Sequence, residues 1–218
     1  MKQAVLFDLD GTLLDTLEDL ADAVNAVLSA LGYPSHPLEA YRYFVGDGVE
    51  TLMRRALPPA AASDAEILRR AMGLQRSEYA NRLFAKTRPY PGVIELLADL
   101  ERRGVRMAIL SNKPDPAVGE VVRHYFPEVR FTIVRGARPG VPVKPDPGSA
   151  LQVAGEMGIP PADFLYLGDT NTDMRTAIGA GMFPVGALWG FRTGEELRES
   201  GAAKLIARPG ELIGLLTP

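Results

Sequence analysis

The chain has 218 residues, of which 46% are hydrophobic and 23% charged, a composition typical of a folded globular protein with one large domain or a main domain and a smaller companion. Its formal net charge of -3 provides no field that would attract nucleic acid or an anionic membrane. Cysteine is absent, which excludes disulfides, thiolate nucleophiles and zinc-thiolate sites. No apolar run reaches the roughly 20 residues that a membrane-spanning helix needs, and acidic residues interrupt the first apolar run before a signal peptide could form. We therefore expect a cytoplasmic protein that binds neither nucleic acid nor membranes.

The first predicted strand is short and apolar and covers residues 3–7. A helix with apolar residues at helical spacing is predicted over 17–31. The pattern then stays helical to about residue 87, with no strand between. Ser63 stands three residues before Glu66, the spacing of a capping box, and is expected to begin the last of these helices.

Beyond this helical region, short β-branched or apolar segments alternate with helical patterns, the last of which covers 209–216. The predicted strands cover residues 105–111, 131–134, 164–169, 183–188 and 203–207. Such alternation is typical of a parallel sheet with helices on both faces. We therefore predict an α/β fold: a doubly wound parallel sheet formed by residues 1–14 and 88–218, with an all-helical cap over 15–87 inserted after the first strand. Open parallel sheets bind ligands at the carboxyl ends of their strands, so we expect the cap to act as a substrate-selecting lid there.

Four polar clusters fall at the ends of predicted strands or in the loops that leave them: Asp8 with Asp10, Ser111 with Asn112, Lys144, and Asp169 with Asp173. In a parallel sheet these positions converge on one edge. Carboxylates gathered there repel by up to about 4 kcal/mol per pair at about 4 Å and an effective dielectric constant of about 20, so a divalent cation is expected. Oxygen ligands without His or Cys favour Mg²⁺. Together with a lysine and a serine, the ion makes a pocket for a phosphoryl group.

Asp8 is the candidate nucleophile for phosphoryl transfer. The chain has no Cys, and its two histidines, His36 and His124, are far apart and lack a metal-ligand spacing. A carboxylate nucleophile forms an aspartyl phosphate. Asp10, two residues further on, is within reach to protonate the leaving oxygen and later to activate water.

Four segments resemble the ordered motifs of the haloacid dehalogenase superfamily: DLDGT at 8–12, LSNK at 110–113, VKPDP at 143–147 and GDTNTD at 168–173. The resemblance implies Asp8 as nucleophile, Asp10 as general acid and base, and Ser111 and Lys144 as phosphoryl binders. It also implies Mg²⁺ held by Asp8, the backbone carbonyl of Asp10 and Asp169, with Asp173 in support. The aspartate at position 10 argues against true dehalogenases, which resemble this superfamily but lack that second acid.

Three segments resemble the phosphoglycolate phosphatase branch of this superfamily more specifically: VGDGVETLMRRAL, SNKPDPAV and GAGMFPVGALWGFRTGEEL. This resemblance implies a phosphatase acting on a small phosphomonoester, 2-phosphoglycolate first among them. The loop FTIVRGARPGVPVKPDP departs from that branch, which carries an acidic, glycine-rich segment there. β-Phosphoglucomutase-like phosphomutases, pyrophosphatases and broad sugar-phosphate phosphatases share the scaffold, so these activities stay open. A phosphoacceptor switch is the alternative that is not an enzyme.

Several residues receive supporting or substrate-binding assignments. Thr12 and Asn112 lie beside the motif residues and are assigned to phosphate binding. A carboxylate on the substrate would need a cation, and the cap offers Arg42, Arg54 and Arg55. The expected partner is a small phosphorylated metabolite, and the sequence leaves both a monomer and a homodimer open.

Overall fold

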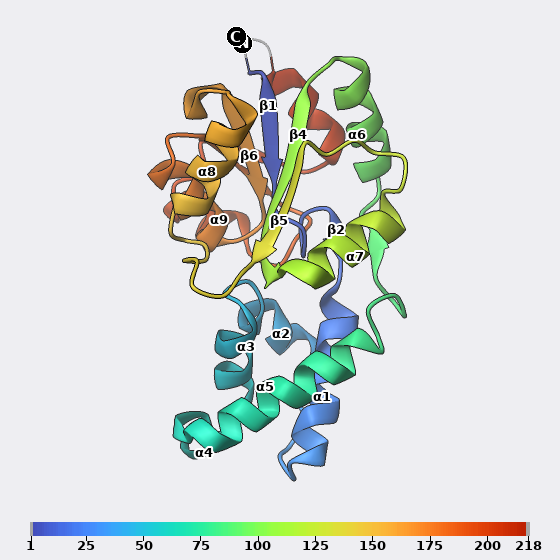
Figure 1. Cartoon of the computed structure of the whole chain (residues 1–218), viewed down its shortest axis with the longest axis vertical. Helices are drawn as coiled ribbons and strands as arrows, with labels where there is room; N and C mark the ends of the chain where they lie inside the picture. Colours follow the sequence, from blue (N-terminus) through green and yellow to red (C-terminus); the bar gives the residue numbers. More distant parts are fainter. Residues whose placement is uncertain (1, 217–218) are drawn as a thin grey trace. The chain divides into compact units, whose positions relative to one another are not determined.

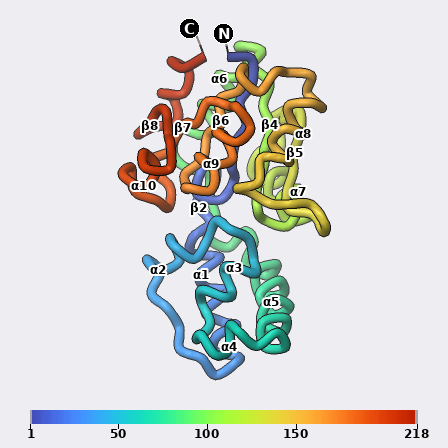
Figure 2. Tube along the Cα trace, turned by 90° about the vertical axis from the view of Figure 1, so that its left-hand side faces the viewer, coloured from blue at the N-terminus to red at the C-terminus, as the bar shows by residue number. Residues whose placement is uncertain are grey.

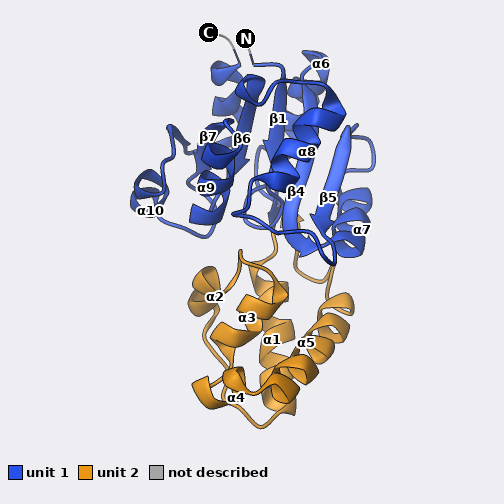
Figure 3. Cartoon of the chain, turned by 60° about the vertical axis from the view of Figure 1, so that its left-hand side comes forward, with its two compact units in different colours: residues 1–14, 89–218 blue, residues 15–88 orange. Residues whose placement is uncertain are grey.

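The computed structural model describes residues 2–216, and the chain divides into two compact units (Figure 3). The core unit runs up to Leu14 and resumes at Pro89, and the insert unit covers Asp15–Arg88. Among the residues described, no helix is long and apolar enough to cross a membrane.

The core unit is built on a six-stranded sheet with the order β5-β4-β1-β6-β7-β8, in which every neighbouring pair is parallel (Figure 1). Its strands are β1 (Ala4–Phe7), β4 (Arg106–Pro114), β5 (Ile133–Ala137), β6 (Phe164–Gly168), β7 (Phe183–Ala187) and β8 (Lys204–Ile206). β1 is fully buried, because it lies between β4 and β6 and helices cover both faces of the sheet. The predicted doubly wound parallel sheet is confirmed.

The helices of the core unit are α6 (Val93–Arg102), α7 (Asp115–Tyr125), α8 (Gly148–Met157), α9 (Asn171–Gly179) and α10 (Gly194–Glu199), with the 3-10 helices η1 (Pro161–Asp163) and η2 (Pro209–Leu215). α8 and α9 lie on one face of the sheet, and α6 and α7 on the other (Figure 1). Successive residues of a strand point to opposite faces of the sheet. On the face covered by α8 and α9, Leu6 and Tyr166 pack with Val153 of α8 and Ala177 of α9.

Several boundaries in the core unit differ from the prediction. β5, expected over 131–134, covers Ile133–Ala137. The C-terminal segment expected as an ordinary helix over 209–216 is the 3-10 helix η2. β4 continues to Pro114, three residues beyond its expected end at Ser111, because its polar end still pairs with β5 at Ala137 after a shift in register.

The insert unit is helical, with α1 (Leu17–Ala30), α2 (Leu38–Phe44), α3 (Val49–Ala56), α4 (Pro59–Ser63) and α5 (Ala65–Ala80). α1 and α5 lie side by side, as Figure 2 shows. The capping box expected at Ser63 is wrong. Ser63 ends α4 and donates its hydroxyl to the Pro59 carbonyl, whereas Asp64 caps α5 by accepting the backbone N–H groups of Glu66 and Ile67.

Where the chain passes from one unit to the other, hydrogen bonds within each unit join the two chain segments that enter and leave it. The short strands β2 (Leu14–Asp15) and β3 (Arg88–Pro89) form a separate two-stranded sheet at this passage. Inside the insert unit, the buried carboxylate of Asp19 accepts the backbone N–H of Lys86 at 3.0 Å and both the N–H and the hydroxyl of Thr87, at 2.8 and 2.7 Å. Inside the core unit, Tyr90 N donates to Leu13 O at 3.1 Å.

Candidate active site

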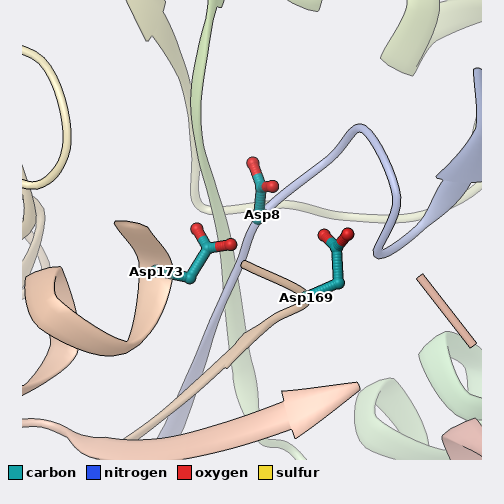
Figure 4. A group of neighbouring side chains, drawn as sticks. All are labelled: Asp8, Asp169 and Asp173. Carbon is teal, nitrogen blue, oxygen red and sulfur yellow. The ribbon is translucent and has the colours of Figure 1, made fainter. Parts of the chain in front are cut away.

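Three buried carboxylates meet at the carboxyl end of the central strands (Figure 4). Asp8 directly follows β1, Asp169 directly follows β6, and Asp173 lies in the first turn of α9. Asp169 and Asp173 are completely buried and Asp8 is 6% exposed. One carboxylate oxygen from each lies within 4.8 Å of the others. An all-oxygen set at this separation suits a hard divalent cation.

Lys144 places its ammonium between two of these acids. Its Nζ lies 2.8 Å from Asp8 Oδ1 and 2.6 Å from Asp173 Oδ1, and its side chain is only 3% exposed. The backbone of Lys144 is fixed by Asn112, whose amide group donates to Lys144 O and accepts from Lys144 N, both at 2.9 Å. Asn112 therefore holds the loop that presents the lysine.

Hydrogen bonds hold the Asp169 carboxylate, and the backbone at Gly11 and Gly190 lies close against its side chain. Its Oδ1 accepts the Thr12 hydroxyl and its Oδ2 accepts the backbone N–H of Phe191, each at 2.8 Å. A Cβ added at Gly11 would lie 2.3 Å from Asp169 Oδ2, and one added at Gly190 would lie 2.2 Å from Asp169 Cβ. Only glycine fits at either position while this carboxylate keeps its place.

Asp173 has three hydrogen-bond partners: Thr170, Lys144 and Tyr166, whose hydroxyl donates to Oδ1 at 3.5 Å. Its Oδ2 accepts the backbone N–H and the hydroxyl of Thr170, at 3.0 and 2.7 Å, which completes a capping box at the start of α9. Its Oδ1 accepts from Lys144. The sequence favours a capping role for an aspartate here, and the structure combines that role with a contact to the lysine.

The charges of the cluster do not balance, because three carboxylates face one ammonium. Burial, followed by the charge of Asp173, raises the pKa of Asp8 well above its ordinary value despite the opposing effect of Lys144. Burial and Asp173 raise the pKa of Asp169 to about 7. Burial alone would lower the pKa of Lys144, but the carboxylates of Asp173 and Asp8 outweigh it and raise that pKa. The excess of buried negative charge and the oxygen-only donor set fit a divalent cation.

Asp10 lies beside this cluster and pairs with a lysine that the sequence reasoning did not select. Lys113 Nζ is 2.8 Å from Asp10 Oδ1, and the two side chains are 4% and 13% exposed. Ser111 Oγ accepts the backbone N–H of Lys113 at 3.2 Å. A possible signal was the position of Lys113 directly after Ser111 and Asn112, at the end of an apolar strand where a lysine has little access to water.

The three cap arginines each have an acidic partner inside the insert unit. The pairs, at 2.8, 2.8 and 2.6 Å, are Arg42 with Glu39, Arg54 with Glu50, and Arg55 with Asp47. The arginine side chains are 37% to 48% exposed. These are surface ion pairs, each worth at most about 1 kcal/mol.

Residues 5–187 match the model of the haloacid dehalogenase-like hydrolases. The chain belongs to this family. Among curated relatives, the phosphoglycolate phosphatase of Pseudomonas putida strain KT2440 is 36% identical over 200 residues, covering 90% of this chain and 73% of the relative. The phosphoglycolate phosphatase of Nitrosospira multiformis is 37% identical over 199 residues, covering 90% of this chain and 88% of the relative.

Solved structures of other proteins share the whole architecture of this haloacid dehalogenase-like hydrolase. A structure from Lactobacillus delbrueckii subsp. bulgaricus has a TM-score of 0.91 at 29% identity and covers 99% of both chains. CbbY from Rhodobacter sphaeroides, solved in complex with phosphate, has a TM-score of 0.80 at 25% identity and covers 97% of this chain and 96% of its own. The superfamily membership predicted from the four motifs is confirmed.

Proposed function

We propose that this hydrolase is a Mg²⁺-dependent phosphatase that cleaves 2-phosphoglycolate through an aspartyl phosphate on Asp8. The observation that carries the proposal is the position of the Asp8 carboxylate, 2.8 Å from Lys144 Nζ and grouped with two further buried acids. The names of the relatives support the substrate, because two curated proteins that cover most of this chain are phosphoglycolate phosphatases. The phosphate complex of CbbY supports a phosphoryl group as the ligand of this architecture.

The proposed reaction has two steps. In the first, an oxygen of Asp8 bonds to phosphorus as the bond to the ester oxygen breaks, and Asp10 gives its proton to that leaving oxygen. In the second, Asp10 takes a proton from water, the water oxygen bonds to phosphorus, and the acyl phosphate bond breaks. Phosphate leaves and the Asp8 carboxylate is restored. Ser111 and Lys144 hold the phosphoryl oxygens through both steps.

The cation site would be formed by Asp8, Asp169 and the backbone carbonyl of Asp10, with Asp173 in support. When bound there, Mg²⁺ supplies positive charge that offsets the repulsion between the carboxylates and the phosphoryl oxygens. Thr12 and Asn112 serve the site indirectly in this proposal, because their side chains already contact Asp169 and the Lys144 backbone.

Substrate selection is assigned to the insert unit acting as a lid. A 2-phosphoglycolate molecule carries a carboxylate in addition to its phosphate, and Arg42, Arg54 and Arg55 are the cations that we propose for it. Each would exchange its present acidic partner for the substrate, and the exposed ion pairs described above are weak enough to allow this exchange.

Phosphate release by the purified protein with Mg²⁺ tests the proposal. The esters compared by kcat/KM are 2-phosphoglycolate, β-glucose 1-phosphate, other sugar phosphates and pyrophosphate, and 2-phosphoglycolate should give the highest value. Asp8→Asn, which keeps the shape but removes the nucleophile, should abolish turnover. Release of one equivalent followed by a stall that a sugar phosphate relieves would indicate a phosphomutase instead. A long-lived phosphoenzyme without turnover would indicate a phosphoacceptor switch.

A further inference from the structure

The buried ion pair between Lys113 and Asp10 joins two segments 103 residues apart in the sequence. Lys113 stands at the polar end of β4, and Asp10 lies in the loop that follows β1. The lysine side chain is 4% exposed, and an ammonium so removed from water is costly unless a carboxylate compensates it. The pairing therefore constrains both side chains.

Asp10 depends on this one contact for its orientation. Among residues 2–216, its carboxylate has no hydrogen-bond or ion-pair partner other than Lys113 Nζ, which binds Oδ1. Asp169 and Asp173, by contrast, each accept hydrogen bonds on both oxygens. The contact to Oδ1 leaves Oδ2 of Asp10 as the oxygen available to a reacting group.

The backbone of Lys113 is itself held in place by its neighbours. Its backbone N–H is bound by the Ser111 hydroxyl, and β5 packs so closely that a Cβ at Gly136 would lie 2.6 Å from Lys113 O. The two lysines of the site also differ in their partners. Lys144 contacts Asp8 and Asp173, whereas the carboxylate bound by Lys113 is that of Asp10.

We propose that Lys113 is a positioning residue that holds the Asp10 carboxylate in place for proton transfer to the leaving oxygen and from water. This inference rests on the proposed phosphatase function and adds a residue to it. Misplacing a catalytic group by about 1 Å costs up to about 100-fold in rate, and general acid-base help is worth about 100-fold to 10,000-fold. Loss of the lysine should therefore lower kcat, with little effect on substrate binding.

The first test compares Lys113→Met and Lys113→Arg with Lys204→Met, a matched control on the exposed edge strand β8. For 2-phosphoglycolate, we expect Lys113→Met to lower kcat by about 10-fold to 100-fold with KM changed less than about 3-fold. Lys113→Arg should recover part of the loss, and Lys204→Met should match the wild type. With p-nitrophenyl phosphate, whose phenolate leaves without a proton, the first-turnover burst should change much less. A purely structural defect would slow both substrates alike and would overturn the inference.

The second test is a double-mutant cycle with Asp10→Asn. If Lys113 acts through Asp10, then adding Lys113→Met to Asp10→Asn should lower kcat by less than about 2-fold further. Independent losses that multiply, or a raised KM with unchanged kcat, would show that the lysine binds substrate and would overturn the inference. If Lys113→Met fails to fold in a thermal melt, Lys113→Gln takes its place in the cycle. An active wild type with unimpaired Lys113 variants refutes the inference alone, whereas a wild type inactive on every ester refutes the proposed function and the inference with it.

Discussion

Without a divalent cation, the fold should lose stability as the pH rises from 5 to 8. The pKa of Asp169 is raised from 3.8 to about 7 in the folded protein, by burial and by the charge of Asp173. A group with a raised folded pKa contributes stability that is complete below its unfolded pKa and is lost as the pH rises through its folded pKa. For Asp169 these two values give a loss of about 3 kcal/mol in the free energy of unfolding between about pH 5 and pH 8. Asp8, whose pKa is also raised, acts in the same direction.

Urea denaturation in the presence of a chelator measures this loss. The single tryptophan, Trp189, reports on the site because its Nε1 donates to Thr12 O at 3.0 Å. Asp169→Asn is the matched control, since its amide has nearly the same shape and does not ionise. The difference between the two proteins isolates the contribution of Asp169 from groups that both proteins share.

Saturating Mg²⁺ should abolish most of the decline. At a concentration 100 times its Kd, a ligand that binds only the folded state adds about 2.7 kcal/mol of stability. The gain in melting temperature should be larger at pH 8 than at pH 5, where protons compete for the carboxylates. If the wild type and Asp169→Asn show the same pH dependence without Mg²⁺, or if the wild type becomes more stable between pH 5 and 8, the argument from the burial of Asp169 is refuted.

Two further substitutions test the packing of the cluster. Lys144→Met leaves Asp8 and Asp173 without their cation, so the free energy of unfolding at pH 8 should fall by about 3 to 5 kcal/mol. The fall should be smaller at pH 5, because the raised pKa of Asp8 favours its neutral form as the pH decreases; urea curves at both pH values check this. Gly190→Ala would place a methyl group 2.2 Å from Asp169 Cβ and should weaken Mg²⁺ binding by about 10-fold or more in calorimetry. Gly155→Ala, which meets open space on α8, is its control, and equal affinities for the two glycine variants would contradict the close approach.

The convergence of Asp8 and Asp169 was predictable from the sequence because it follows from topology alone, whereas Lys144, in the loop between β5 and α8, was selected by its motif. Parallel strands end at the same edge of a sheet, so a residue placed just after a strand needs no side-chain information to be assigned to that edge. The alternation of apolar strands with helical patterns gave the order in which those strands occur along the chain. The family motifs then predicted a role for each of these residues.

Other features depend on interactions that no local pattern records. Ser63 and Asp64 are both good capping residues. The choice between them depends on where the two helices end and begin: α4 ends at Ser63 and α5 begins at Ala65, so only Asp64 stands between them. The pairing of Lys113 with Asp10 requires the register of β1 against β4 and the direction of two side chains beyond it. Sequence reasoning places both residues near the site, but it gives no reason to join them.

The hydrogen bonds at the passage between the two units have a consequence for how such a chain can be altered. Hydrogen bonds between Asp19 and Thr87 join the two ends of the insert unit. A hydrogen bond between Tyr90 and Leu13 joins the two segments of the core unit next to the insert. In both cases the donor and the acceptor belong to the same unit. The insert therefore has the form of an exchangeable module: another helical segment joined between the same two points would keep the Leu13–Tyr90 bond of the core unit. It would have to supply its own counterpart of the Asp19–Thr87 bonds, which lie within the insert.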